Sequence, residues 1–191
     1  RTVVLNLRLS EDELHTKMHH KTRYNTHLAS RKGLGFKESD DVGEFWKLLK
    51  KTEKQDRFQT HGKDYFFRLI EYFKNGEEIR TELFLVDFDG KAIAGAIILF
   101  YGDTAYYLHG AMDRNYKELM APYFMHWQVV KHAKDAGYHY YDLWGINARR
   151  WSGVTRFKLG WGGQTKEYPG SFDLIVSKFW YLIYKIARKL F

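Results

Sequence analysis

The 191-residue chain contains no cysteine, which excludes several kinds of chemistry at once. Disulfide scaffolds, zinc sites built on thiolates and cysteine nucleophiles all require that residue. The chain has only 2 prolines, while hydrophobic residues make up 45% and aromatic residues 18% of the sequence. A chain of this composition can bury enough apolar surface to fold, so we expect a globular protein. The absence of cysteine is compatible with a reducing, cytoplasmic setting.

Long hydrophobic runs and an amino-terminal leader are also lacking. The longest apolar run, residues 92–101, is about half of the ~20 residues that a membrane-spanning helix needs. The chain begins with Arg1 rather than with an initiator Met or a signal peptide. We therefore expect a piece of a longer protein, located in the cytoplasm or at the inner face of the membrane.

Several catalytic motifs are missing from the sequence. There is no Gly-x-Ser-x-Gly elbow, and the glycine-rich segment Gly160–Gly163 lacks the Lys-Thr ending of a P-loop. The pyrophosphate loop of acetyl-CoA-dependent acetyltransferases is absent because position 157 is Phe. These absences disfavour a serine hydrolase, a P-loop enzyme and an acyl-CoA donor.

Positive charge is concentrated at the carboxy-terminal end of a chain whose net charge is +8. Residues 149–191 carry nine basic residues against two acidic ones. A concentrated positive field suits partners that carry phosphate, such as nucleic acid, nucleotide sugars or anionic lipid headgroups. The alternative is ordinary solubilising charge. Arg149, Arg150 and Arg156 are our candidates for contacts with the phosphate backbone of a nucleic acid, which demand charge and little geometry.

The hydrophobic pattern predicts an α+β domain. Helices are expected over residues 10–31, from residue 39 through residue 49, and from residue 65 to residue 76. Strands follow at 83–88, 92–101 and 105–110, with Asp89-Gly90 as a hairpin turn. A helix over 119–136 and a strand over 140–144 complete the order. We see neither an internal repeat nor a linker.

The final segment, residues 172–191, predicts an amphipathic basic helix. Most such helices pack on their own protein, and we favour that interpretation. Contact with a membrane surface or with a partner is the alternative.

A metal site is weakly indicated. Glu11, His15 and His19 would share one face of the first helix, but no third-ligand motif accompanies them. A solvated polar helix face explains the pattern better. His126 and His132 are six residues apart, on different helix faces, and we interpret them as incidental. We therefore expect no metal.

Motifs along nearly the whole chain carry a family resemblance. They are Arg23-Tyr24-Asn25, Ala29 to Gly33, Thr52 to Tyr65, Ala94-Gly95, Tyr106 to Ala111, Trp127, Tyr140 to Ile146 and Phe157 to Gly163. With this order and spacing, the sequence resembles the Fem (FemABX) family of tRNA-dependent aminoacyltransferases, which build the peptide cross-bridge of bacterial peptidoglycan.

The resemblance implies a GNAT-like acyltransferase fold, in which a mainly antiparallel central sheet is flanked by helices. Family members typically have two such domains and a carboxy-terminal helix that returns to the first. Residues 1–191 resemble the second domain with that helix, so we expect one domain whose amino-terminal partner domain is missing. The implied activity moves an amino acid from aminoacyl-tRNA, a co-substrate, to the stem peptide of a UDP-linked or lipid-linked muropeptide, without metal or CoA.

The resemblance also implies site residues. Phe157 and Lys158 match the functional Phe-Lys pair of the family, and Lys158 would place an ammonium near the developing oxyanion or the terminal tRNA phosphate. His61 and Tyr65 match positions that contact the muropeptide, although the basic residue is often Arg in the family. Tyr107 matches a tyrosine that lines the substrate site. With this resemblance, the nucleic acid expected at Arg149, Arg150 and Arg156 is the tRNA.

Asp142 completes the candidate set for substrate binding. It is predicted at the end of a strand, where it could act as a base or orient another group. A hydrogen bond that ends the strand is an equally good interpretation.

Three alternatives remain open at this level. The chain could be a non-catalytic module that binds muropeptide, an RNA-binding protein with aromatic stacking surfaces, or an N-acyltransferase with another acceptor amine. The sequence does not distinguish the donor amino acid or the acceptor amine.

Overall fold

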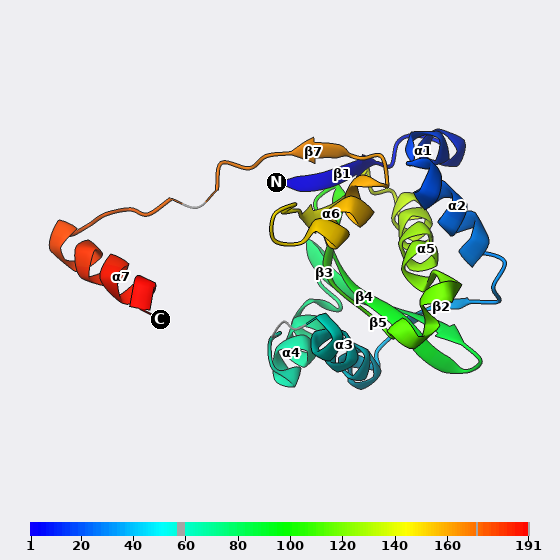
Figure 1. Ribbon diagram of the computed structural model, residues 1–191, viewed down its shortest axis with the longest axis horizontal. Helices are drawn as coiled ribbons and strands as arrows, with labels where there is room; N and C mark the ends of the chain where they lie inside the picture. The colour runs from blue at the N-terminus through cyan, green and yellow to red at the C-terminus, as the bar shows by residue number, and fades with distance from the viewer. Residues whose placement is uncertain (57–59, 171, 191) are drawn as a thin grey trace.

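The computed structural model describes residues 1–56, 60–170 and 172–190, and its strands form one seven-stranded sheet. The order across the sheet is β2-β3-β4-β5-β6-β1-β7 (Figure 1). All neighbouring strands are antiparallel except β5 and β6, which are parallel. The strands are β1 Thr2–Asn6, β2 Gly35–Ser39, β3 Ile79–Phe88, β4 Lys91–Tyr101, β5 Thr104–Met112, β6 Tyr140–Gly145 and β7 Gln164–Lys166.

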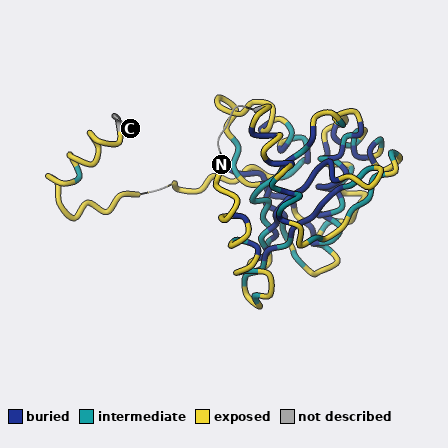
Figure 2. Tube along the Cα trace, turned by 90° about the horizontal axis from the view of Figure 1, so that it is seen from below, coloured by how far each residue is buried: buried dark blue, intermediate teal, exposed yellow. Residues whose placement is uncertain are grey.

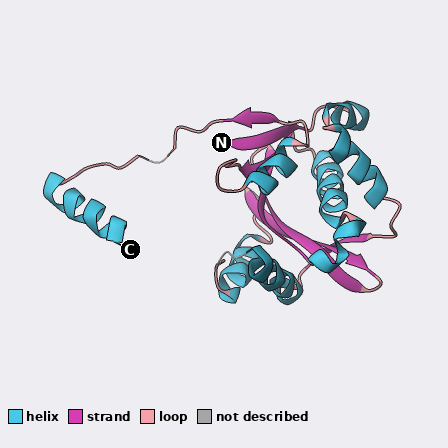
Figure 3. Ribbon diagram, viewed as in Figure 1, coloured by secondary structure: helices cyan, strands magenta, loops and turns pink. Residues whose placement is uncertain are grey.

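Helices other than α7 cover both sides of this sheet (Figure 3). The helices are α1 Glu11–Lys17, α2 His20–Ala29, α3 Val42–Asp56, α4 Lys63–Phe73, the 3-10 helix η1 Arg114–Leu119, α5 Ala121–Asp135, α6 Ser152–Leu159 and α7 Lys178–Leu190. The expected α+β fold is confirmed, with the meander, the following helix and the next strand in the predicted order. Strands β1 and β2, in the part of the chain that was expected to be helical, were not predicted.

Two apolar cores lie on opposite faces of the sheet. We call them the α5 face, where α1, α2 and α5 pack, and the α3 face, where α3 and α4 pack. Strand β4 supplies both cores, since Ile98 belongs to the core on the α5 face and Ile97 to the core on the α3 face. A strand that is buried on both faces reads as a continuous apolar run, which accounts for the run at residues 92–101.

The single helix expected over residues 10–31 is wrong, because the chain forms two helices there. The start is as expected: Ser10 caps α1, and Glu13 completes a capping box. Met18 then takes an extended conformation, and His19 caps α2 while its backbone N–H donates to the carbonyl of Gly160 at 2.9 Å. Glu11, His15 and His19 therefore do not share one helix.

The glycine-rich segment at 160–163 allows close packing of the backbone. A Cβ atom on Gly162 would overlap the backbone of Lys17, and one on Gly163 would lie 2.7 Å from the carbonyl oxygen of Val4. Gly162 also has a φ of +76°, which glycine adopts at little cost. The segment thus leads from α6 into the short edge strand β7, which the sequence pattern did not predict.

Helix α7 stands away from the rest of the molecule (Figures 1 and 2). It begins at Lys178 rather than at residue 172, and Phe191 lies outside the described residues. Phe179 and Trp180 are each 67% exposed. The favoured expectation that this helix packs on its own protein is therefore wrong for this structure. Among the described helices, none is both long enough and apolar enough to cross a membrane.

Candidate active site

Helix α6 carries the predicted Phe-Lys pair, and its connection to β6 is held by one side chain. The amide oxygen of Asn147 accepts hydrogen bonds from the backbone N–H groups of Arg149 and Arg150, at 3.1 and 3.0 Å. The backbone N–H of Asn147 donates to the hydroxyl of Thr155 on α6 at 3.0 Å. These bonds fix the start of the helix relative to the end of β6.

Lys158 points back from α6 toward the sheet and is only 7% exposed. Its ammonium donates to the carbonyl oxygen of Gly145 at 2.9 Å and lies 5.6 Å from the centre of the Tyr107 ring. Burial lowers the pKa of Lys158 to about 8, and the Asp142 carboxylate acts in the opposite sense. A lysine ammonium has three N–H donors, and within the described chain only the bond to Gly145 occupies one. Lys158 therefore offers donors to a ligand from a buried position.

The ammonium of Lys158 lies where β5 and β6 separate. Parallel pairing of these strands ends at Tyr106 and Asp142, although β5 continues to Met112 and β6 to Gly145. The two groups next to the ammonium, the Gly145 carbonyl and the Tyr107 ring, come from the parts of β6 and β5 beyond this pairing. Gly145 still pairs with β1 and Tyr107 with β4, so only the edges of β5 and β6 that would face each other lack a partner strand here. Such edges leave backbone groups that a substrate can approach.

Aromatic side chains surround Lys158 on the α5 face. The Tyr107 ring meets the ring of His126 edge to face at 4.5 Å, and Phe157 lies 5.3 Å from the same imidazole. Phe157 also contacts Tyr123 on α5, at 5.0 Å between ring centres. Burial raises the pKa of Tyr107 to about 12, so its hydroxyl stays protonated at neutral pH. Lys158 thus faces an apolar wall that strengthens electrostatic interactions.

His126 is a central residue of this wall, and it was not predicted as one. It is 1% exposed, and its Nδ1 atom lies 2.8 Å from the hydroxyl of Tyr141. Burial lowers the pKa of His126 to about 3, and the charge of Lys158 adds to the lowering. The imidazole is therefore neutral at pH 7. Its position six residues before His132 gave no indication of this role, since the contacts come from β5, β6 and α6.

A second group of side chains lies on the α3 face. The rings of His61 and Tyr65 stack at 4.2 Å, and the Tyr65 hydroxyl lies 3.5 Å from Nε2 of His109 on β5. Burial lowers the pKa of His109 to about 4, and His61 contributes to the lowering. His109 was not singled out from the sequence, although it stands within the Tyr106–Ala111 motif.

The comparison with known sequences decides the family. A profile described as the FemAB family matches residues 2–91 and residues 82–189. The chain belongs to the FemAB family. A lipid II:glycine glycyltransferase from Staphylococcus epidermidis is 28% identical over 116 residues, which are 58% of this chain and 28% of that relative. The chain thus spans less than a third of the length of this curated FemAB relative.

Solved structures confirm the GNAT-like fold of this FemAB chain. A crystal structure of FemX superposes with a TM-score of 0.79 at 19% identity, covering 85% of this chain and 58% of that one. A structure titled as a possible acetyltransferase from Clostridium difficile 630 gives a TM-score of 0.56 at 12% identity, covering 74% and 98%. The FemAB chain therefore has a GNAT-like α+β fold with a mixed, mostly antiparallel sheet.

The FemAB-type residues predicted from the sequence fall into two groups. Lys158, Phe157 and Tyr107 meet on the α5 face, while His61 and Tyr65 meet on the α3 face. Lys158 lies on a helix and is buried, so it is not simply an exposed lysine at the end of a strand. The roles of these five residues remain predictions.

Asp142 is 2% exposed and already has partners within the FemAB chain. Its carboxylate accepts hydrogen bonds from the Thr2 hydroxyl and from the Trp144 backbone N–H, the latter at 2.7 Å. Burial and the Asp142 charge raise the pKa of Tyr168, in the segment after β7. The bond to Thr2 joins β6 to β1 and the bond to Trp144 lies at the end of β6, which favours the strand-ending interpretation of Asp142.

The three arginines predicted for tRNA lie around α6 and are exposed. Arg149 and Arg150 belong to the connection that Asn147 holds, and the Arg150 guanidinium lies 5.3 Å from the centre of the half-exposed Trp151 ring. Arg156 lies on α6 itself, two residues before Lys158. Contact with RNA remains a prediction for all three. Among the described residues, no cluster of three or more His, Cys, Asp or Glu side chains could hold a metal ion.

Proposed function

We propose that this FemAB chain transfers an amino acid from aminoacyl-tRNA to an amine on the stem peptide of a peptidoglycan precursor. The observation that carries the proposal is the buried Lys158 ammonium, which has donors to spare where β5 and β6 separate. The relative named lipid II:glycine glycyltransferase supports the choice of reaction.

In the proposed reaction, the neutral amine of the stem peptide attacks the ester carbonyl carbon of the aminoacyl-tRNA. A C–N bond forms, the C–O bond to the terminal ribose breaks, and the proton lost by the amine ends on the released ribose hydroxyl. Negative charge develops on the carbonyl oxygen in between. Lys158 donates to this oxygen from a site of low polarity, where such a bond lowers the barrier most.

The two faces of the sheet suggest how both substrates reach Lys158. His61 and Tyr65 on the α3 face would hold the muropeptide, while Phe157 and Tyr107 on the α5 face would line the path of the aminoacyl end. Tyr107 and His109, which contact the two groups, both lie on β5 beyond its pairing with β6. In this proposal Asp142 orients the end of β6 through its bonds to Thr2 and Trp144.

We also propose that the chain acts as one GNAT-like domain together with another domain. The short match to longer relatives and the exposed apolar side of α7 support this arrangement. The proposed site of action is the cytoplasm or the inner face of the membrane, where the tRNA and the precursor are both present.

A transfer assay tests the role of Lys158 directly. The chain, within the full product of its gene, is incubated with charged tRNA and with lipid-linked or UDP-linked muropeptide, and the elongated peptide is measured by mass. We expect Lys158→Ala to lower kcat by about 10²–10³, as for the loss of an oxyanion donor. Lys47→Ala, at an exposed lysine on α3, is the control.

Equal rates for Lys158→Ala and the parent protein would remove Lys158 from the mechanism. A parent protein that binds both substrates without elongating the peptide would instead favour the non-catalytic module.

A further inference from the structure

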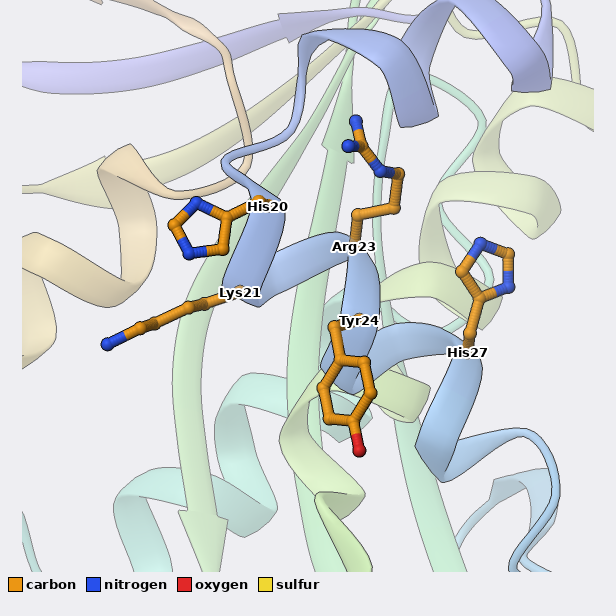
Figure 4. Close-up of a pocket in the computed structure, with 5 residues that line it drawn as sticks. All are labelled: His20, Lys21, Arg23, Tyr24 and His27. Atoms are coloured by element: carbon orange, nitrogen blue, oxygen red, sulfur yellow. The ribbon is translucent and has the colours of Figure 1, made fainter.

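Helix α2 presents a basic surface that the site described above does not use. A surface hollow of about 540 Å³ is lined by His20, Lys21, Arg23, Tyr24 and His27 (Figure 4). Arg23 is tied to the body of the protein, since its guanidinium donates to the carbonyl oxygen of His15 at 3.2 Å. Lys21 and Tyr24 extend away from the helix, and Tyr24 is 65% exposed. We call His20, Lys21, Tyr24, His27 and Arg31 the outer α2 surface.

The charge around this surface is one-sided. Residues 14–37 include six lysines or arginines and neither aspartate nor glutamate. Lys21 and Arg31 are exposed, and neither has an ion-pair partner in the described parts of the chain. A patch of unpaired positive charge without carboxylates is complementary to a polyanion.

The outer α2 surface is joined to the helix that carries Lys158. The backbone N–H of His19 donates to the Gly160 carbonyl at 2.9 Å, directly after the end of α6. A Cβ atom on Gly160 would overlap the hydroxyl of Thr22, so α2 and the end of α6 are in close contact. A long polyanion bound along α2 can therefore extend toward α6 and its exposed Arg156.

We propose that the outer α2 surface binds RNA, with Lys21 and Arg31 on the phosphates and Tyr24 against a base. This inference rests on the proposed function, in which the RNA is the acceptor arm of the aminoacyl-tRNA. An exposed aromatic ring among basic side chains is the arrangement that single-stranded nucleic acid uses for stacking. An anionic membrane is a poorer match, because this surface lacks the large aliphatic residues that insert into a bilayer.

Fluorescence anisotropy with an uncharged, labelled RNA hairpin that has a single-stranded 3′ end tests the proposal on the complete chain. We expect Lys21→Gln/Arg31→Gln to raise Kd about tenfold and to lower the slope of log Kd against log salt by about 1–2. Lys47→Gln/Lys54→Gln removes the same charge from exposed positions on α3 and should leave both values unchanged.

Substitutions of Tyr24 separate the contribution of base stacking to RNA affinity from that of charge. We expect Tyr24→Ala to weaken binding about fivefold or more, and Tyr24→Phe to restore it, because either ring can stack on a base. Circular dichroism of each variant verifies folding, which these exposed positions should not disturb.

Equal RNA affinity of the α2 double variant and the α3 control would overturn the α2 site. So would binding to phosphatidylglycerol vesicles without binding to the hairpin. The transfer assay distinguishes the two proposals: Lys158-dependent transfer with unchanged RNA binding in the α2 variant removes only the α2 site. Binding of RNA that depends on α2, without any transfer, removes only the proposed reaction.

Discussion

Tyr107 and His109 are two residues apart on β5, yet their side chains lie on opposite faces of the sheet. The pairing with β4 explains this, since Tyr107 is opposite Ile98 and His109 is opposite Ile97, leaving Leu108 as the extra residue of a bulge. In a regular strand, residues i and i+2 share a face. The bulge therefore directs Tyr107 to Lys158 and His109 to Tyr65.

The position of the Tyr107 side chain is expected to require a glycine at position 110. A Cβ atom at residue 110 would overlap the Tyr107 hydroxyl. We predict that Gly110→Ala lowers the free energy of unfolding by about 1–3 kcal/mol, because the ring must move within a packed core. In a Tyr107→Ala background the same change should cost far less, and denaturant unfolding of the four proteins measures the difference. Equal costs in both backgrounds would show that Tyr107 does not occupy this position.

The buried ammonium of Lys158 is expected to lower the free energy of unfolding, because its position serves the proposed reaction rather than the stability of the fold. We predict that Lys158→Met lowers the rate of transfer as Lys158→Ala does and raises the free energy of unfolding at pH 7 by about 1–2 kcal/mol, because an apolar side chain of similar length replaces a buried ammonium. Urea unfolding measures this change. If Lys158 served only to stabilise the fold, Lys158→Met would instead lower the free energy of unfolding.

The difference in free energy of unfolding between Lys158→Met and the parent protein should depend on pH. The folded-state pKa of Lys158 is about 8, below the usual 10.5, so the unfolded chain binds more protons between these values. The parent protein therefore gains stability as pH rises from about 8 to about 10.5, and the difference from Lys158→Met shrinks. A difference that stays constant from pH 7 to pH 10 would contradict the lowered pKa.

Much of the fold follows from local sequence patterns. The meander of β3, β4 and β5 was predicted because Asp89-Gly90 marks a hairpin between apolar runs. The break between α1 and α2 was not, because it depends on a contact between His19 and Gly160, which are far apart in the sequence. Strand β7 was missed for a similar reason: only its pairing with β1 makes it a strand.

The candidate site could be predicted only in part. The family resemblance led to Phe157 and Lys158, but the burial of Lys158 depends on contacts with β5 and β6 that spacing does not reveal. The contributions of His109 and His126 depend on the bulge at Leu108 and on the fold of α5 over the sheet. The basic stretch at 14–37 escaped notice because acidic residues on either side cancel it in the total charge.

The pair of His132 and Glu82 predicts how stability changes above pH 6.5. His132 Nε2 lies 2.7 Å from the Glu82 carboxylate, which raises the pKa of His132. The stabilisation by this pair is complete below about pH 6.5, the usual pKa of histidine. It is lost as pH rises through the raised pKa of His132 in the folded protein. We expect a loss of up to about 1 kcal/mol, since the pair is partly exposed.

Thermal unfolding of the parent protein and Glu82→Gln between pH 6.5 and pH 8.5 measures this loss. The stability of the parent should fall relative to that of Glu82→Gln across the window, because the gain that accompanies deprotonation of Lys158 near pH 8 is common to both proteins. Below pH 6.5, the buried His109 and His126 change stability in the opposite direction. Their lowered pKa values make the unfolded chain bind more protons, so stability rises as pH rises. An identical pH dependence of both proteins above pH 6.5 would show that Glu82 does not stabilise the charged form of His132.

Removal of the carboxy-terminal segment should leave the rest of the chain folded. Helix α7 stands apart from both cores, and residues 172–188 are exposed or at most partly buried. We predict that a chain ending at residue 170 has an unchanged free energy of unfolding, because no buried apolar contact is lost. Truncation should also improve solubility, since the apolar side of α7 includes Phe179, Ile183 and Ile186, each more than 40% exposed. Urea unfolding and light scattering of both lengths test this, and a clear loss of stability on truncation would show that α7 packs on the body of the protein in solution.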